Sequence, residues 1–129
     1  MIRRNLVVAA LTLTSLMAVA GPVAAKDGDV IRQGQCTAGS TWKLKLSPEN
    51  GRIEVEFQVD QNRNGRPWNV RLVDNGTLVW SGLRYTQAPS GAFTVRRLVT
   101  NRAGLDRFVA RAVNPRTGEI CRGTATAGF

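Results

Sequence analysis

Apolar and polar residues alternate without interruption from Arg52 to Asp60. Side chains on a β-strand point to opposite faces with a period of two. One face of this segment therefore carries only apolar residues, whereas the other carries Glu54, Glu56 and Gln58. The pattern predicts a half-buried strand at the centre of the core. Its inward residues are Ile53, Val55, Phe57 and Val59.

The same alternation recurs in weaker form along the chain, interrupted by turn-forming residues every ten residues or so, roughly the spacing of strands in a sandwich. Asn50-Gly51 and Asn75-Gly76 predict tight hairpins, because Asn and Gly tolerate the positive φ angles that two-residue turns require. No segment has the 3.6-residue period of a helix. The pattern predicts an all-β domain of seven main strands in two packed sheets.

Three segments raise the question of which residues face the core. In 77–86 two sets of apolar residues compete for burial. A β-bulge near Arg96 and Arg97 would bring Leu98 into the core. Between residues 105 and 113 the arginines cannot be buried cheaply without partners, so the intervening residues should face inward. These residues are Phe108, Ala110 and Ala112.

The N-terminus has the layout of a secretory signal peptide. Arg3 and Arg4 precede an uncharged run from Leu6 to Ala20, and small residues follow up to Ala25. A charged start, a short apolar stretch and small residues before the cut are typical of such peptides. A retained membrane helix is the alternative, but it needs about 20 apolar residues, and this run is shorter and contains hydroxyl residues. We place cleavage after Ala25, with a cut after Ala20 as the alternative.

Cleavage would leave residues 26–34 as a flexible lead-in and 35–129 as one sandwich domain. Two of the 18 basic residues and none of the 9 acidic residues lie in the first 25 positions, so the exported chain has 16 basic residues against 9 acidic ones. Most of the basic residues are arginines. Codon usage in a GC-rich genome would produce this bias, and so would attraction to anionic polymers outside the cell, because net positive charge favours such partners.

Cys36 and Cys121 both lie in the exported part. Export to an oxidising compartment predicts that they form a disulfide. A cross-link that closes a loop of this length stabilises a protein by about 4–5 kcal/mol in the chain-entropy description. Free thiols or metal ligands are the alternatives; two cysteines without any histidine cannot supply a closed zinc site.

Several short motifs are distributed over the exported chain. They are Gly34-Gln35-Cys36, Trp42-Lys43-Leu44, Trp68-Asn69-Val70 and Gly118-Glu119-Ile120-Cys121-Arg122-Gly123. Together they resemble a group of small secreted actinobacterial proteins of unknown function. Residues 103–114 and 117–121 resemble the last two strands of many bacterial immunoglobulin-like domains. The resemblance implies an immunoglobulin-like Greek-key sandwich and export, but no activity. Antibody domains join their second and sixth strands by a disulfide, whereas Cys36 and Cys121 lie near the two ends of the exported chain. The binding sites of antibody domains are therefore not transferred to this chain.

The composition excludes several kinds of catalysis. The sequence contains no histidine, so serine or cysteine nucleophiles lack an imidazole base. Glu54 and Glu56 share one strand face at a separation that a glycosidase could use. Lys43, Lys45 and Arg96 are expected to neutralise them, which favours cross-strand ion pairs over catalysis. We therefore expect a protein that is not an enzyme and needs no cofactor.

Two further motifs are weak. The segment 60–65 matches the first half of a calcium-binding loop, but the position that requires a bidentate Glu is Arg71. We therefore expect a loop that connects strands and no metal site. Asn75-Gly76-Thr77 fits a glycosylation sequon, but the same residues are required for the hairpin turn.

An immunoglobulin-like arrangement would place the third, sixth and seventh strands side by side in one sheet. Four arginines would then share its outer face without an acidic partner. They are Arg71, Arg107, Arg111 and Arg122. Guanidinium groups suit phosphate and carboxylate ligands. A solvated arginine face without a ligand is the alternative, because faces of one sign also occur without partners.

We therefore predict a secreted, monomeric, non-enzymatic protein that binds anionic cell-envelope polymers or extracellular nucleic acid through this face. The alternative is a small secreted inhibitor or ligand carrier that uses a loop or a cavity. Exposed hydrophobic tips at Trp68, Trp80 or Tyr85 would favour the alternative, whereas an uninterrupted arginine face would favour the first function.

Overall fold

The structure, a computed structural model, describes residues 26–129. The signal peptide predicted for residues 1–25, with its cut after Ala25 or Ala20, lies outside the described residues. Within residues 26–129 the chain forms strands and no helix. The strands are β1 (Val30–Gln35), β2 (Thr41–Glu49), β3 (Arg52–Asp60), β4 (Pro67–Asp74), β5 (Thr77–Tyr85), β6 (Ala92–Thr100), β7 (Asp106–Val113) and β8 (Ile120–Ala127).

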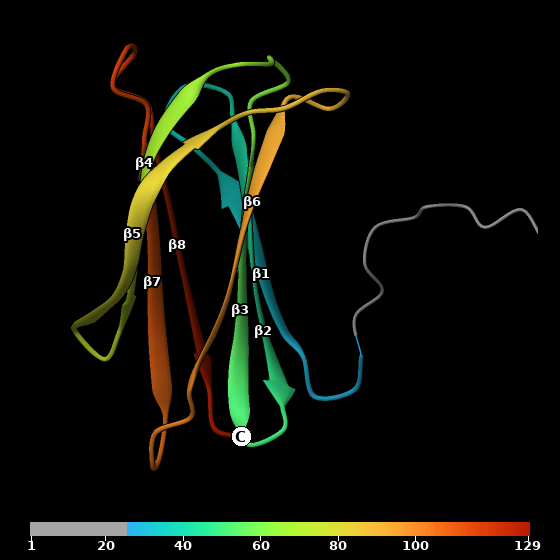
Figure 1. Cartoon of the computed structure of the whole chain (residues 1–129), viewed down its shortest axis with the longest axis vertical. Helices are drawn as coiled ribbons and strands as arrows, with labels where there is room; N and C mark the ends of the chain where they lie inside the picture. The colour runs from blue at the N-terminus through green and yellow to red at the C-terminus, as the bar shows by residue number, and fades with distance from the viewer. Residues whose placement is uncertain (1–25) are drawn as a thin grey trace, which may run out of the picture.

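The eight strands form two antiparallel sheets of four strands each. Their orders are β1-β2-β3-β6 and β5-β4-β7-β8. Figure 1 shows the sheets as two layers, and one hydrophobic cluster with residues from both fills the space between them. The all-β, two-sheet prediction is confirmed, but the strand count of seven is wrong. The extra strand is β1, which pairs with β2 along its whole length and occupies most of the lead-in predicted at 26–34.

The alternation at Arg52–Asp60 produces the central strand β3, which pairs with β2 on one side and β6 on the other. Its four apolar residues are completely buried, as predicted. Burying side chains of this size contributes about 1.5–3 kcal/mol each. In β7 the inward positions are also those predicted: Phe108, Ala110 and Ala112 are at most 1% exposed.

The position of the β-bulge differs from the prediction. Strands β3 and β6 pair without a register shift, so no bulge occurs near Arg96 and Arg97, and Leu98 lies opposite Glu54 on the outer face, where it is half exposed. The irregularity lies instead between β4 and β5, where Leu72 pairs with Trp80 and Val73 pairs with Leu78. The extra residue, Val79, explains why the sequence pattern of this segment was ambiguous.

A disulfide closes one side of the sandwich, where β1 lies beside β8. Cys36 and Cys121 are bonded, as predicted, with their Cα atoms 4.4 Å apart. The carboxylate of Glu119, only 5% exposed, reinforces this side. It accepts hydrogen bonds from the backbone N–H groups of Ala38 and Ser40, both at 2.9 Å, and from the Ser40 hydroxyl at 2.7 Å.

The opposite side, where β5 lies beside β6, is closed without a covalent bond. Guanidinium groups of Arg84 and Arg97 lie 4.6 and 4.8 Å from the centroid of the half-buried Trp80 ring. Gly82 leaves room for this ring, because a Cβ atom at that position would lie 2.6 Å from Trp80 Cζ2. Cation–π contacts of this kind contribute about 0.5–1 kcal/mol where they are exposed.

Candidate anion-binding face

Three arginines lie side by side on the outer face of the β5-β4-β7-β8 sheet. Arg71 of β4 is paired directly with Arg111 of β7, and Arg111 is paired with Arg122 of β8. All three are exposed, whereas the residues before and after each of them are buried. Because side chains alternate along a strand, all three guanidinium groups point away from the core. We call these three residues the arginine row.

The face around the arginine row has no exposed carboxylate. Strands β4, β5, β7 and β8 and the two hairpin loops that join them contain three acidic residues, Asp74, Asp106 and Glu119, which are 0%, 0% and 5% exposed. Rows of uncharged residues flank the arginines on both sides. The neighbouring rows contain Leu83, Asn69, Val113 and Ile120 on one side, and Leu78, Val73, Val109 and Thr124 on the other.

This arrangement costs the folded protein free energy. Side chains directly opposite each other on neighbouring strands have Cβ atoms about 4.5–5.5 Å apart, and like charges in such pairs are destabilising. Among residues 26–129 no carboxylate lies within 4.0 Å of the guanidinium groups of Arg71, Arg111 or Arg122. An anion bound across the row would offset the repulsion and could accept charge-assisted hydrogen bonds from adjacent arginines.

Arg107, the fourth arginine predicted for this face, stands apart from the row. It is exposed and faces outward, but it is paired with Thr126, and Val109 separates it from Arg111. Four residues along a strand span about 13 Å. The structure therefore brings three of the four predicted arginines together and places the fourth near the start of β7.

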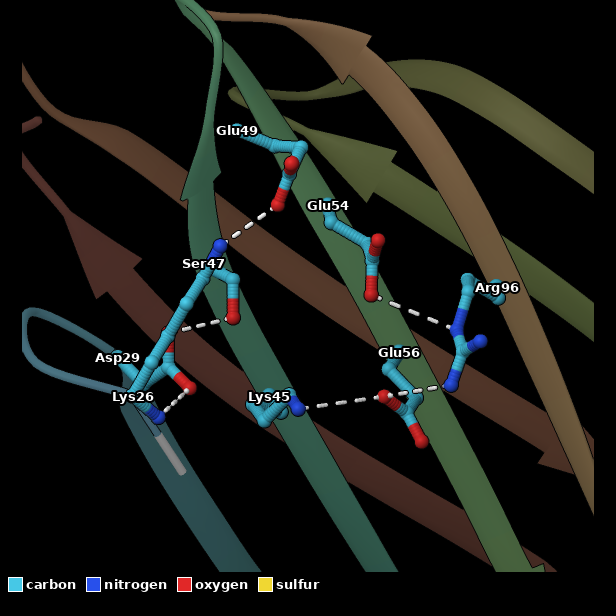
Figure 2. A network of polar contacts seen from close by, with 8 residues as sticks. All are labelled: Lys26, Asp29, Lys45, Ser47, Glu49, Glu54, Glu56 and Arg96. Atoms are coloured by element: carbon cyan, nitrogen blue, oxygen red, sulfur yellow. Dashed lines mark hydrogen bonds and ion pairs between the residues drawn. The ribbon is translucent and has the colours of Figure 1, made fainter. Parts of the chain in front are cut away.

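The outer face of the other sheet has a different charge pattern, shown in Figure 2. Arg96 Nε lies 3.4 Å from Glu54 Oε1, and Arg96 Nη2 lies 3.4 Å from Glu56 Oε2. Lys45 Nζ lies 3.5 Å from the same oxygen of Glu56. The predicted ion pairs are thus present for Lys45 and Arg96, but Lys43 lies opposite Gln58 and pairs with neither glutamate. Here acidic residues alternate with basic ones, in contrast to the arginine row.

Two weak motifs have structural explanations. Asp60 Oδ1 accepts a hydrogen bond from the backbone N–H of Asn62 at 2.9 Å. In the described part of the chain no three His, Cys, Asp or Glu side chains form a group that could hold a metal ion. At the sequon, Asn75 has a φ of 47°, and its side-chain amide donates to Leu105 O and accepts the Arg107 N–H, which joins the turn to the start of β7. That asparagine therefore fits the hairpin role.

The three predicted hydrophobic tips behave differently. Trp68 is completely buried, and its indole N–H donates to Gln61 Oε1 at 3.0 Å. Trp80 is half-buried between β5 and β6. Only Tyr85, 50% exposed, projects from the surface. These residues therefore do not form a shared hydrophobic tip.

The sheet that carries the arginine row also contains a pair of buried carboxylates, which the sequence analysis did not predict. Asp74 at the end of β4 and Asp106 at the start of β7 are both 0% exposed, and none of their carboxylate oxygens has a hydrogen-bond donor among the groups that the structure describes. Burial raises the pKa of Asp74 to about 6; the neighbouring carboxyl group of Asp106 adds to the rise, and Arg102 opposes it. Arg102 Nε lies 3.8 Å from Asp74 Oδ2.

This pair predicts a pH-dependent stability. Because the pKa of Asp74 is raised in the folded state from 3.8 to about 6, its contribution is fully present below pH 3.8 and is lost as the pH rises through 6. We expect the free energy of unfolding to fall by about 1–3 kcal/mol between pH 4 and pH 7.5 from this pair. Asp74→Asn should remove that fall, and denaturant titrations at each pH measure it.

The exposed Asp27 supplies the control for this prediction. Asp27→Asn removes the same formal charge without touching the pair, so its pH profile should follow that of the unmodified protein. Parallel profiles for Asp74→Asn and the unmodified protein would show that burial does not raise the pKa of Asp74.

Comparisons with protein-family models, curated proteins and solved structures find no match to this chain. The resemblance to secreted actinobacterial proteins therefore stays a prediction. No helix of residues 26–129 is long and apolar enough to cross a membrane.

Proposed function

We propose that this is a secreted, non-enzymatic protein that binds anionic polymers of the cell envelope or extracellular nucleic acid through the arginine row. The observation that carries the proposal is the direct pairing of Arg71, Arg111 and Arg122 on a face without an exposed carboxylate. Planar guanidinium groups in a row match a chain of repeated phosphate or carboxylate groups. The disulfide is consistent with an oxidising compartment outside the cytoplasm.

We further propose that the sandwich is immunoglobulin-like. The order of strands supports this: β4, β7 and β8 are neighbours in one sheet, and β2, β3 and β6 are neighbours in the other. Immunoglobulin domains likewise place their third, sixth and seventh strands in one sheet and their first, second and fifth side by side in the other. On this assignment β1 is an addition before the first strand, and β5 extends the sheet that carries the arginine row.

The test compares two double variants that remove the same charge. Arg111→Ser with Arg122→Ser removes two members of the row, and Arg32→Ser with Arg52→Ser removes two exposed arginines of the other sheet. Binding to a single-stranded 20-nucleotide DNA and to poly-glutamate is measured at several salt concentrations. We expect the row variant to lose about tenfold or more in affinity, and its salt slope with DNA to fall by about 1.4.

The control variant should keep its salt slope and most of its affinity, because its arginines lie outside the row. Equal losses for the two variants would show that net charge alone attracts the polymer. Absence of salt-dependent binding by the unmodified protein would contradict the proposal directly.

A second function, that of a small secreted inhibitor or ligand carrier, is favoured by one observation. A hollow of about 390 Å³ lies among loops at one end of the sandwich. A cavity of that size falls within the range of small-molecule sites, which is about 300–1,000 Å³.

A further inference from the structure

We propose that this hollow is a binding site for a small phosphate-bearing ligand, separate from the arginine row. Three loops line it: 36–40 between β1 and β2, 61–66 between β3 and β4, and 114–119 between β7 and β8. The last two lie at the end of the sandwich that is uppermost in Figure 1, opposite the C-terminus. We call the cavity the loop-end hollow.

The lining of the loop-end hollow is cationic. It includes Arg63 and Arg66 from loop 61–66 and Arg116 from loop 114–119. In the part of the chain that the structure describes, none of these guanidinium groups has a carboxylate within 4.0 Å. Three arginines that line one hollow from two loops offer the forked donors that phosphate oxygens accept.

One carboxylate, that of Glu119, also lines the hollow and accepts hydrogen bonds from loop 36–40. Glu119 Oε2 accepts the backbone N–H groups of Ala38 and Ser40, and Oε1 accepts the Ser40 hydroxyl. These bonds hold loop 36–40 in place, and the single negative charge of Glu119 offsets only part of the charge of the three arginines. The positive charge of the hollow is therefore available to a ligand.

The arginine-bearing loops are held by buried polar side chains. Thr86, 2% exposed, bonds to loop 61–66 through its hydroxyl, which donates to Arg63 O and accepts the Arg66 N–H, and through its own backbone. Asn114, 1% exposed, accepts the backbone N–H groups of Arg116 and Thr117. Loops fixed before binding lose little conformational freedom when a ligand arrives, so they favour a specific site.

The test uses pyrophosphate as the probe, titrated calorimetrically into the mature protein at constant ionic strength. We expect saturable binding at one site. Arg63→Ser with Arg116→Ser should weaken it by about tenfold or more, because each charge-assisted hydrogen bond is lost with its guanidinium. The matched control is Arg32→Ser with Arg52→Ser, which removes the same charge from exposed positions outside both proposed sites and should leave pyrophosphate affinity within about twofold.

Each outcome decides the proposal. Absence of saturable binding, or equal losses in the two variants, would overturn it, and so would tighter binding of citrate than of pyrophosphate. A 5′-phosphorylated oligonucleotide that competes with pyrophosphate, where the unphosphorylated form does not, would support it and identify a polymer end as the ligand. Competition by glycerol phosphate alone would identify a free phosphate ester. Single-stranded DNA binding by the Arg63/Arg116 variant tests the arginine row independently.

Discussion

Replacing Cys36 and Cys121 by alanine is expected to lower the free energy of unfolding by about 4 kcal/mol. The bond closes a loop with a sequence separation of 85, so its removal gives the unfolded chain much more conformational freedom. It also frees the side of the sandwich where β1 lies beside β8. Urea titration of the double variant and of the unmodified protein, with and without reductant, measures the difference.

Reductant provides the internal control for the disulfide. The reduced unmodified protein should unfold at the same urea concentration as the double variant, and reductant should not affect the variant, which has no thiols. Equal unfolding midpoints for the oxidised protein and the variant would mean that the packing of β1 and β8 holds this side closed without the bond.

The second large effect is expected for Glu119→Ala, which should lower the free energy of unfolding by about 3 kcal/mol or more. The change removes the acceptor for three donors, on Ala38 and on the buried Ser40. Buried donors that lose their partner cost about 1–3 kcal/mol each, although water entering the space left by the side chain would reduce the total.

Glu54→Ala is the matched control for this substitution. Its carboxylate is ion-paired with Arg96 on an outer sheet face, where such pairs contribute about 0–1 kcal/mol. If both glutamate variants lose the same small amount, the hydrogen bonds of Glu119 do not stabilise loop 36–40.

Sequence reasoning was most successful where one residue pattern has only one structural solution. The nine alternating residues of β3 allow a single inward face, and its four apolar side chains are fully buried. The Asn-Gly turns were equally clear, and Asn50 and Asn75 have φ angles of 50° and 47°. Positive φ is costly for most residues, so an Asn-Gly pair predicts a hairpin turn from two residues alone.

The strand order could be anticipated only in part. The separation of Arg71 from Arg111 along the chain gives no register, and a slip of one residue would have turned one side chain toward the core. The apolar residues on either side of each arginine indicate that its side chain points outward. The direct pairing within the row depends instead on contacts between strands, which a single sequence does not encode locally. For the same reason the sequence grouped Arg107 with the row, although it lies about 13 Å from Arg111 along β7.

Features formed by several loops or strand ends were missed for the same reason. Asp74 and Asp106 each look like ordinary polar residues at a strand end, and only their joint burial makes them a coupled pair. Arg63, Arg66 and Arg116 lie in two loops that the sequence separates by about half the domain. The β-bulge at Val79 was visible only as an ambiguous alternation, because an extra residue shifts the pattern without marking its own position.

The two sides of the sandwich are closed in different ways: a covalent bond joins the layers on the β1–β8 side, and only noncovalent contacts join them on the β5–β6 side. We expect thermal opening that separates the layers to begin where Arg84 and Arg97 contact Trp80, because the disulfide of Cys36 and Cys121 holds the other side together. Arg122 directly follows Cys121 in β8, so the arginine row ends beside the disulfide. We therefore expect opening between β5 and β6 to leave the spacing of the arginine row, which lies on β4, β7 and β8, unchanged.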